Sequence, residues 1–229
     1  MQEGVVIKST GSWYEVRNDN GEVVLCRLRG KIRLDGLRTT NPVSVGDNVI
    51  YEKENHKDTC VINKIVPRYN VIGRESVNLS KASHIIASNI DQAILVATIA
   101  QPRTSTGFID RFLVTAEAYH IPTTIVFNKS DLYDEEQMAQ AEELISVFNN
   151  IGYHSFMISA KTGFQCEVLK DIMKDKVNLF SGHSGVGKSA LINRLDPTLN
   201  VRVGEISDVH EKGKHTTTFS QMFPLSFGG

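Results

Sequence analysis

A glycine-rich segment near the end of the chain has the residue types and spacing that bind phosphate. Residues 182–189 read Gly-His-Ser-Gly-Val-Gly-Lys-Ser and fit the pattern G-x-x-x-x-G-K-[ST]. Glycines let successive backbone N–H groups turn toward phosphate oxygens, the lysine reaches the β- and γ-phosphates, and the final hydroxyl binds Mg²⁺. The segment therefore predicts a nucleoside triphosphate site. The candidate contacts are Gly182, His183, Ser184, Gly185, Val186, Gly187, Lys188, Ser189 and Ala190.

The residues on either side of this segment agree with phosphate binding. Residues 177–181 read as a buried strand, and residues 188–195 read as the start of a helix. Such a helix aims its positive end at a bound anion. Lys188 is therefore a candidate catalytic cation and Ser189 a candidate Mg²⁺ ligand. The alternative is a glycine-rich turn that binds nothing.

A second motif points to the base of the nucleotide. Asn128-Lys129-Ser130-Asp131 follows a β-branched stretch at residues 123–127, as expected of a loop at the carboxyl end of a parallel strand. The Asp131 carboxylate can accept hydrogen bonds from the guanine N1–H and exocyclic amine, and adenine has neither donor in that position. Asn128, Lys129 and Asp131 are therefore candidate guanine contacts, and GTP is favoured over ATP. The alternative is an ordinary turn that leads into a helix.

A third segment, Ser159-Ala160-Lys161, follows another short strand at residues 155–158. Its backbone N–H groups could meet the guanine O6. The tripeptide gains meaning only from the two motifs around it, and Ser159, Ala160 and Lys161 join the candidate nucleotide contacts.

The order of these motifs is unusual, because the guanine motif precedes the phosphate loop. With residues 213–218, Gly-Lys-His-Thr-Thr-Thr, the segments 128–131, 159–161 and 182–189 resemble the bacterial ribosome small subunit-dependent GTPase (RsgA-type) family of circularly permuted GTPases. In that family an oligonucleotide/oligosaccharide-binding (OB) barrel precedes the GTPase domain, and a zinc-binding helical domain follows it. The D-x-x-G motif and the zinc domain lie outside this chain, so zinc is expected only there.

This resemblance implies a GTP hydrolase that produces GDP and phosphate, needs Mg²⁺, binds the small ribosomal subunit and its rRNA, and acts late in the maturation of that subunit. Stimulation by the ribosome and a monomeric state are also expected. An RNA-binding module regulated by guanine nucleotide without meaningful turnover is the alternative function. An ATP-dependent P-loop kinase is disfavoured by Asp131.

The resemblance also implies a switch segment at residues 202–218 that responds to GTP and Mg²⁺. One of Thr216, Thr217 and Thr218 is expected to approach Mg²⁺ and the γ-phosphate, with Thr217 as the candidate ligand. The attacking water needs a polar group to orient it, because the family has an apolar residue where Ras-like enzymes use glutamine. His215 is the candidate, and the alternative is an exposed or RNA-contacting histidine.

Composition indicates a soluble cytoplasmic protein. The 229 residues are 41% hydrophobic and 22% charged, which favours folded cores over disorder. No apolar stretch is long enough to cross a membrane, and the first residues do not form a signal peptide. Three scattered cysteines lack the spacing of a zinc site or a disulfide framework, so reduced thiols are expected.

The chain is expected to have two domains. Residues 1–68 carry short strand patterns and a hairpin signal at Asn20-Gly21, which predicts an OB barrel, with an SH3-like barrel as the alternative. Residues 69–83 read as a linker. Residues 84–229 form an incomplete α/β GTPase domain, in which strands alternate with helical patterns at 108–120 and 135–149. This alternation predicts a doubly wound, mainly parallel sheet with ligands at its carboxyl edge.

A basic strip in the first domain is a candidate RNA contact. Arg27, Arg29, Lys31 and Arg33 alternate with uncharged residues, which on a strand places four cations on one face. The net charge of the chain is only −1, so any binding to RNA must be local. A solvated polar face is the alternative. Trp13 or Tyr14 could stack on bases, but adjacent strand residues point to opposite faces, so one of them belongs to the core.

Overall fold

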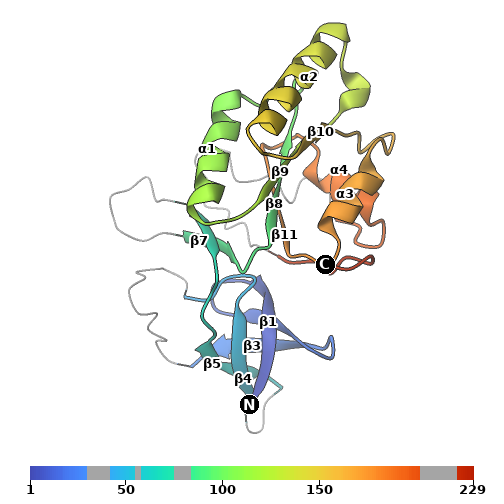
Figure 1. Cartoon of the computed structure of the whole chain (residues 1–229). Helices are drawn as coiled ribbons and strands as arrows, with labels where there is room; N and C mark the ends of the chain where they lie inside the picture. The colour runs from blue at the N-terminus through green and yellow to red at the C-terminus, as the bar shows by residue number, and fades with distance from the viewer. Residues whose placement is uncertain (30–41, 55–57, 75–83, 202–220) are drawn as a thin grey trace, which may run out of the picture. The chain divides into compact units, whose positions relative to one another are not determined.

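The structure is a computed structural model, and it describes residues 1–29, 42–54, 58–74, 84–201 and 221–229. The chain divides into two compact units (Figure 1). The first contains Met1–Ile90 and residues 221–223, and the second contains the described residues from Asp91 onward except those three. No described helix is long and apolar enough to cross a membrane.

A closed barrel of five strands forms most of the first unit. The strands are β1 (Gln2–Ser9), β2 (Tyr14–Asn18), β3 (Val23–Leu28), β4 (Asn48–Lys53) and β5 (Cys60–Ile65). Their order around the barrel is β1-β2-β3-β5-β4, and β4 pairs with β1 to close it. The pairing of β3 with β5 is parallel and the other pairings are antiparallel. This closed five-stranded arrangement confirms the OB-type barrel over the SH3-like alternative.

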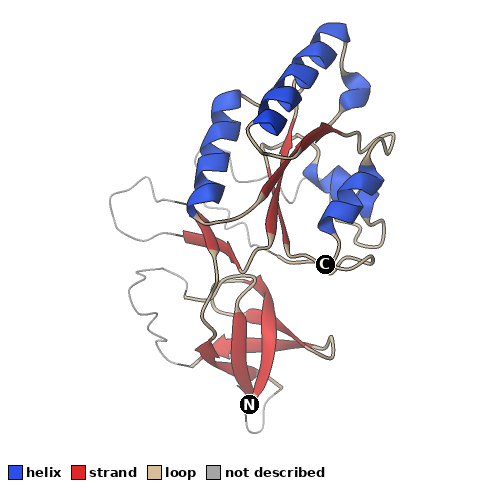
Figure 2. Ribbon diagram, viewed as in Figure 1, coloured by secondary structure: helices blue, strands red, loops and turns tan. Residues whose placement is uncertain are grey.

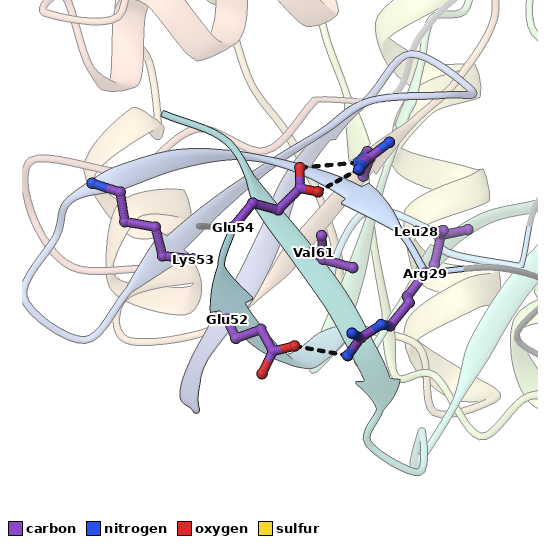
Figure 3. Close-up of a pocket in the computed structure, with 7 residues that line it drawn as sticks. Leu28, Arg29, Glu52, Lys53, Glu54 and Val61 are labelled. Atoms are coloured by element: carbon purple, nitrogen blue, oxygen red, sulfur yellow. Dashed lines mark hydrogen bonds and ion pairs between the residues drawn. The ribbon is translucent and has the colours of Figure 1, made fainter. Parts of the chain in front are cut away.

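The inside of the barrel follows the period-two pattern of its strands. Tyr14 is 1% exposed and Trp13 is 40% exposed, so Tyr14 is the core residue of that pair. Cys26 and Ile62 also lie in the core, which is completed by residues from all five strands. Outward-facing side chains of β3, β5 and β4 form a charged surface that is drawn in Figure 3.

A short antiparallel hairpin follows the barrel. Its strands are β6 (Val71–Arg74) and β7 (His84–Ser88). Strand β6 lies within residues 69–83, which the sequence indicates as a linker, and residues 75–83 lie outside the described part. The sequence pattern misses this strand because it is only four residues long and contains a glycine.

A buried carboxylate, Asp47, forms an ion pair with Arg68 and also links the hairpin to the rest of the first unit through Ser88. The Asp47 carboxylate, which is fully buried, accepts hydrogen bonds from Nε and Nη2 of Arg68, both at 2.6 Å. It also accepts from the Ser88 hydroxyl at 2.6 Å and the Ser44 backbone N–H at 2.8 Å. A buried carboxylate is stable when every lone pair is engaged in this way.

The second unit has a parallel sheet covered by helices on both faces (Figure 2). Its strand order is β10-β9-β8-β11. The strands are β8 (Gln92–Ala97), β9 (Thr123–Phe127), β10 (Ser155–Met157) and β11 (Asn178–Ser181). The helices are α1 (Thr106–Ala118), η1 (Ser130–Leu132), α2 (Glu135–Asn150), α3 (Cys166–Met173) and α4 (Lys188–Leu195). The predicted doubly wound, mainly parallel sheet is therefore confirmed.

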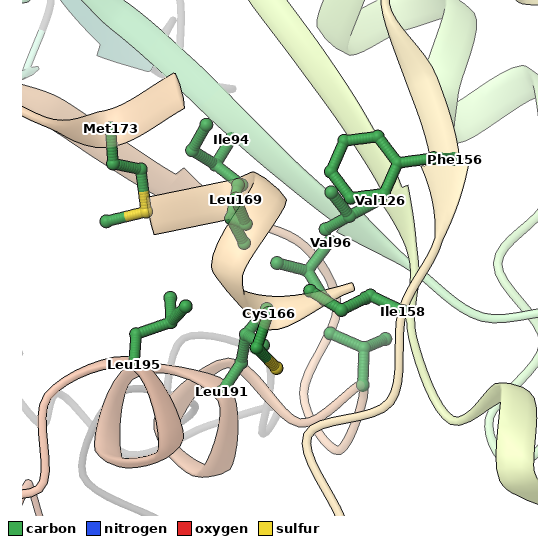
Figure 4. Close-up of a cluster of buried hydrophobic side chains, with 11 residues drawn as sticks. Ile94, Val96, Val126, Phe156, Ile158, Cys166, Leu169, Met173, Leu191 and Leu195 are labelled. Carbon is green, nitrogen blue, oxygen red and sulfur yellow. The ribbon is translucent and has the colours of Figure 1, made fainter. Parts of the chain in front are cut away.

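Side chains of the central strand β8 point alternately into two cores. Ile94 and Val96 pack against α3 and α4 on one face, in the cluster drawn in Figure 4. Leu95 and Ala97 pack against α1 and α2 on the other face. All six residues of β8 are buried, as expected of a strand covered on both sides. This packing fixes the carboxyl edge of the sheet, where the loops of the site begin.

Candidate nucleotide-binding site

Four loops meet at the carboxyl edge of the sheet in the second unit. They follow β8, β9, β10 and β11, and the last three carry the predicted guanine motif, the Ser-Ala-Lys segment and the phosphate loop. Because the strands are parallel and in register, their ends lie at one edge. Segments that are more than 50 residues apart in the sequence thus lie side by side.

The phosphate loop has the backbone shape that its glycines allow. Gly182 has φ +144°, and a Cβ there would lie 2.2 Å from the Val96 carbonyl oxygen. Gly187 has φ +95°, and a Cβ there would lie 2.5 Å from Nδ2 of Asn128. Both positions therefore exclude any side chain, and the loop remains a cradle of backbone groups.

Lys188 is the first residue of α4 and is only 7% exposed. Its Nζ donates to the carbonyl oxygens of Gly182 and His183, both at 2.8 Å. Burial lowers the pKa of Lys188 from its usual value, because the charged form loses solvation. The next residue, Ser189, is 6% exposed and lies in the first turn of the same helix. The loop thus holds a cation and a hydroxyl beside its backbone N–H groups.

The flanking residues of the loop divide between core and solvent. Val186 is buried in the core under the loop, whereas Ser184 and Gly185 are exposed. Ala190 is exposed in the first turn of α4. The His183 ring lies against Phe108 of α1, with ring centroids 3.9 Å apart. Phe108 was not a candidate site residue in the sequence, because it fits the helical pattern of α1 equally well.

Asn128 connects the guanine motif to the two neighbouring loops. Its Nδ2 donates to the Val186 carbonyl oxygen at 2.9 Å, and its Oδ1 accepts from the Ala160 backbone N–H at 3.1 Å. The side chain is 1% exposed. One amide therefore fixes the distance between the phosphate loop, the guanine motif and the Ser-Ala-Lys segment.

The Asp131 carboxylate lies at the open end of this network, with its side chain 12% exposed. Oδ1 accepts from the Ser159 hydroxyl at 2.6 Å, and Oδ2 lies 3.7 Å from Nζ of Lys161. The Ser159 hydroxyl in turn accepts from the Thr162 backbone N–H at 3.1 Å. Asp131 is held in one orientation by these contacts, and Lys161 is 77% exposed.

Tyr133 is a positioning residue that the motifs do not include. Its hydroxyl donates to the Asn128 carbonyl oxygen and accepts from the Ile99 backbone N–H at 3.1 Å. Burial raises the pKa of the Tyr133 hydroxyl. In the same region Nζ of Lys129 donates to the Gln101 carbonyl oxygen. The loop after β8 therefore orients two residues of the guanine motif, and a tyrosine five residues after Asn128 is the only sequence signal of this.

Several predicted residues cannot be placed. His215, Thr216, Thr217 and Thr218 lie outside the described residues, as do Lys31 and Arg33 of the basic strip. Within the described part, no three His, Cys, Asp or Glu side chains gather closely enough to hold a metal ion. Of the two Mg²⁺ ligands expected from the sequence, Ser189 lies in the described part and Thr217 does not.

The residues present fit a guanine nucleotide with Mg²⁺. The phosphate loop excludes side chains at Gly182 and Gly187, which leaves backbone N–H groups and Lys188 for an anion. Ser189 supplies the hard oxygen ligand that Mg²⁺ prefers. Asp131 supplies an acceptor-only carboxylate, held by Ser159, at the position expected for the base.

Comparison with known proteins covers both units. The sequence profile described as RsgA GTPase matches residues 65–229, and the profile described as RsgA N-terminal domain matches residues 3–61. The chain is 53% identical over 227 residues to the protein named small ribosomal subunit biogenesis GTPase RsgA from Bacteroides fragilis (strain YCH46), covering 99% of this chain and 73% of that protein. It is 50% identical to the protein of the same name from Christiangramia forsetii, covering 98% and 72%.

Solved structures give the same result. YjeQ from Thermotoga maritima is similar with a TM-score of 0.76 and 36% identity, over 100% of this chain and 72% of that one. YloQ, described as a circularly permuted GTPase, is similar with a TM-score of 0.62 and 35% identity, over 86% and 65%. The permuted motif order, the OB-type barrel and these matches lead to one conclusion: the chain belongs to the RsgA GTPase family.

Proposed function

We propose that this GTPase binds the small ribosomal subunit and its rRNA, acts late in the maturation of that subunit, and hydrolyses GTP to GDP and phosphate with stimulation by the subunit. A role in small-subunit biogenesis follows from membership of the family. The observation that carries the proposal is the Asn128 amide, which ties the guanine motif, the Ser-Ala-Lys segment and the phosphate loop into one site. The protein is expected to act in the cytoplasm as a monomer, and we assign zinc to none of its residues.

Guanine recognition is assigned to Asp131, Lys129 and the segment after β10. Asp131 accepts from the guanine N1–H and exocyclic amine, and the Ser159 hydroxyl keeps the carboxylate in place. The guanine O6 is assigned to the Lys161 backbone N–H, because the N–H groups of Ser159 and Ala160 already donate to the Phe164 carbonyl oxygen and to Asn128. An adenine base would leave the Asp131 carboxylate without its donors, so selection for GTP is expected.

Phosphate binding is assigned to the loop from Gly182 to Ala190. Lys188 exchanges its bonds with the Gly182 and His183 carbonyl oxygens for the β- and γ-phosphates, and its charge stabilises the charge that develops in the transition state. Ser189 and Thr217 are the proposed Mg²⁺ ligands. Mg²⁺, when bound, would neutralise part of the charge that develops on the phosphates.

His215 is proposed to orient the attacking water. In the sequence it directly precedes the threonines of the switch segment, and the in-line attack needs a polar group opposite the leaving oxygen. Binding to the subunit is favoured by GTP and release by hydrolysis. The chain offers a route for this coupling, because the switch segment 202–218 is soon followed by residues that pair with the barrel, where the Met222 backbone N–H donates to the Ile7 carbonyl oxygen at 2.8 Å.

The test is multiple-turnover GTP hydrolysis with purified small subunits, with large subunits as the control. Hydrolysis that rises only with small subunits supports the proposal, and tight subunit binding without turnover would favour the nucleotide-regulated RNA-binding module instead. His215→Ala should keep near-normal GTP affinity but lower the stimulated rate at least about tenfold, which corresponds to about 1.4 kcal/mol. His210→Ala is the matched variant in the same segment and should hydrolyse GTP at the wild-type rate. Equal rates for the two variants would remove His215 from the reaction.

A further inference from the structure

The outer face of the barrel carries two arginine–glutamate pairs that cross a strand. Strand β5 lies between β3 and β4, and Val61 of β5 is in register with Arg27 on one side and Glu52 on the other. Arg27 binds Glu54 and Arg29 binds Glu52, so both pairs reach over β5 (Figure 3). Val61 is 7% exposed, although it lies on the outer face. The two pairs therefore span β5 and shield Val61 from solvent.

The two pairs differ in how firmly they are held. Arg27 uses Nε and Nη2 on the two carboxylate oxygens of Glu54, with Nε to Oε2 at 3.1 Å, and Thr59 also donates to Glu54 at 2.9 Å. Hydrogen bonding to Glu54 raises the pKa of Arg27. Arg29 uses a single nitrogen, Nη1, at 2.8 Å from Glu52. The side chains of Arg27 and Arg29 are 47% and 69% exposed.

These arginines already use the groups that would bind a phosphate. A guanidinium presents the same planar fork to a carboxylate and to a phosphate. The Glu52 and Glu54 side chains are 37% and 16% exposed, so the Arg29–Glu52 pair is open to solvent and the Arg27–Glu54 pair is partly open. Solvent-exposed ion pairs contribute little to stability, and salt weakens them further. A phosphate of a bound polyanion can therefore replace the glutamate at small cost, but the glutamate competes with it in the free protein.

Exposed apolar side chains next to the arginines favour single-stranded RNA as the polyanion. Val23 and Leu25 share the outward face of β3 with Arg27 and are 52% and 43% exposed. Trp13, which is 40% exposed, precedes β2, the strand beside β3. Cations that follow a backbone and an aromatic ring that stacks on bases are the usual elements of single-strand binding.

We propose that Glu52 and Glu54 are built-in competitors for RNA phosphate, so that RNA binds this face only by exchanging the two arginine–glutamate pairs for arginine–phosphate contacts. The inference rests on the proposed function, since it supplies a regulation of the rRNA contact. The consequence is selective binding. Random RNA gains little affinity from the exchange, whereas RNA whose phosphates match both arginines forms two charge-assisted contacts.

The experiment compares two variants of equal charge. Glu52→Gln/Glu54→Gln removes the two carboxylate charges that compete with phosphate for the arginines, and Glu3→Gln/Glu22→Gln removes two carboxylates of the same barrel that pair with no arginine in the described structure. Each is titrated with a fluorescein-labelled single-stranded 12-nucleotide RNA of mixed sequence at several salt concentrations. Trp13, the only tryptophan, reports contact at this face by its fluorescence.

Glu52→Gln/Glu54→Gln should bind the RNA about three- to tenfold more tightly at low salt, with a steeper salt dependence, up to about 0.7 log units for each freed arginine. The RNA affinity of Glu3→Gln/Glu22→Gln should rise by at most about twofold. Adding Arg27→Ala should cancel the gain from Glu54→Gln, since the freed arginine is then missing. An equal gain in both double variants, no gain, or a gain that survives Arg27→Ala would overturn the proposal, as would RNA binding by no variant.

Thermal melts of each variant confirm that the barrel is folded. Subunit-stimulated GTP hydrolysis separates this inference from the proposed function. If small subunits stimulate the wild-type protein but the glutamate variants bind RNA no better, only the inference fails. If small subunits neither bind nor stimulate the wild-type protein, the proposed function fails first and the inference falls with it.

Discussion

Charged side chains are held differently in the two units. At the nucleotide edge, Asp131 and Lys188 are mostly shielded from water, and each is held by groups from other parts of its own site. On the barrel, Arg27 and Arg29 remain about half or more exposed, and each is paired with a carboxylate from another strand. Burial limits a charge of the first kind to partners within its own site, including a bound nucleotide, because any other partner would leave it poorly satisfied. The second arrangement leaves charges that can exchange one partner for another.

The largest effect is expected at the base. Asp131→Asn should weaken GTP binding and shift the preference toward xanthosine triphosphate by up to about 10⁴ in the ratio of affinities, because the new amide can donate to the xanthine C2 carbonyl. The Asn side chain still offers Oδ1 to the Ser159 hydroxyl, so the loop should keep its shape. Calorimetric titration with both nucleotides measures the ratio.

Asp134→Asn is the matched control, with the same charge change three residues later. Asp134 is the N-cap of α2 and accepts from the Gln137 backbone N–H at 2.8 Å. The Asp134→Asn variant should keep the nucleotide preference of the wild-type protein. Unchanged GTP affinity in Asp131→Asn would show that Asp131 does not contact the base. The contrast between the two units would then lose its main support.

The first unit also contains a buried ion pair, Asp47–Arg68. It tests whether the contribution of an ion pair to stability depends on its burial or on the unit in which it lies. Asp47→Ala should lower the free energy of unfolding of the first unit by about 3–5 kcal/mol, because Arg68 would remain buried without its carboxylate. Denaturation followed through Trp13 fluorescence reports this unit alone. GTP affinity of the folded protein should not change. A loss below about 1 kcal/mol would show that burial does not distinguish the two kinds of pair.

At the phosphate loop the expected effect is on rate. Lys188→Ala should lower the rate of GTP hydrolysis about 10²- to 10³-fold, because a positive charge preorganised beside the phosphates is lost. Lys174→Ala, at the exposed end of α3, is the control and should be as active as the wild type. Single-turnover hydrolysis with small subunits measures both. Normal hydrolysis by Lys188→Ala would exclude the phosphate-loop assignment.

The sequence predicts the nucleotide edge better than the barrel face, and the reason is physical. The phosphate loop depends on local chemistry: glycines that must adopt positive φ, followed at once by a helix, so the residues 188–195 expected to be helical are those of α4. The strand before the guanine motif is likewise β9. For motifs of this kind, the local sequence is sufficient to predict the local structure.

Other features depend on contacts between distant residues. Glu52 and Glu54 meet Arg29 and Arg27 only because β5 brings β4 beside β3, and nothing in the basic strip indicates that two of its cations are paired. The role of Tyr133 depends on the Ile99 backbone N–H, 34 residues away. Helix α3 has only eight residues, too few for a clear periodic pattern.

The smallest effect is expected for the exposed pair itself. Glu54→Gln should lower the free energy of unfolding of the first unit by less than about 1 kcal/mol, because the pair is partly solvated and the Gln amide oxygen can still accept from Arg27 and Thr59. Guanidinium denaturation followed through Trp13 fluorescence, with Glu22→Gln as the control, measures the difference. A loss as large as that of Asp47→Ala would mean that the pair is a structural part of the barrel. Arg27 could then not exchange Glu54 for a phosphate, and it would be held as firmly as the charges at the nucleotide edge.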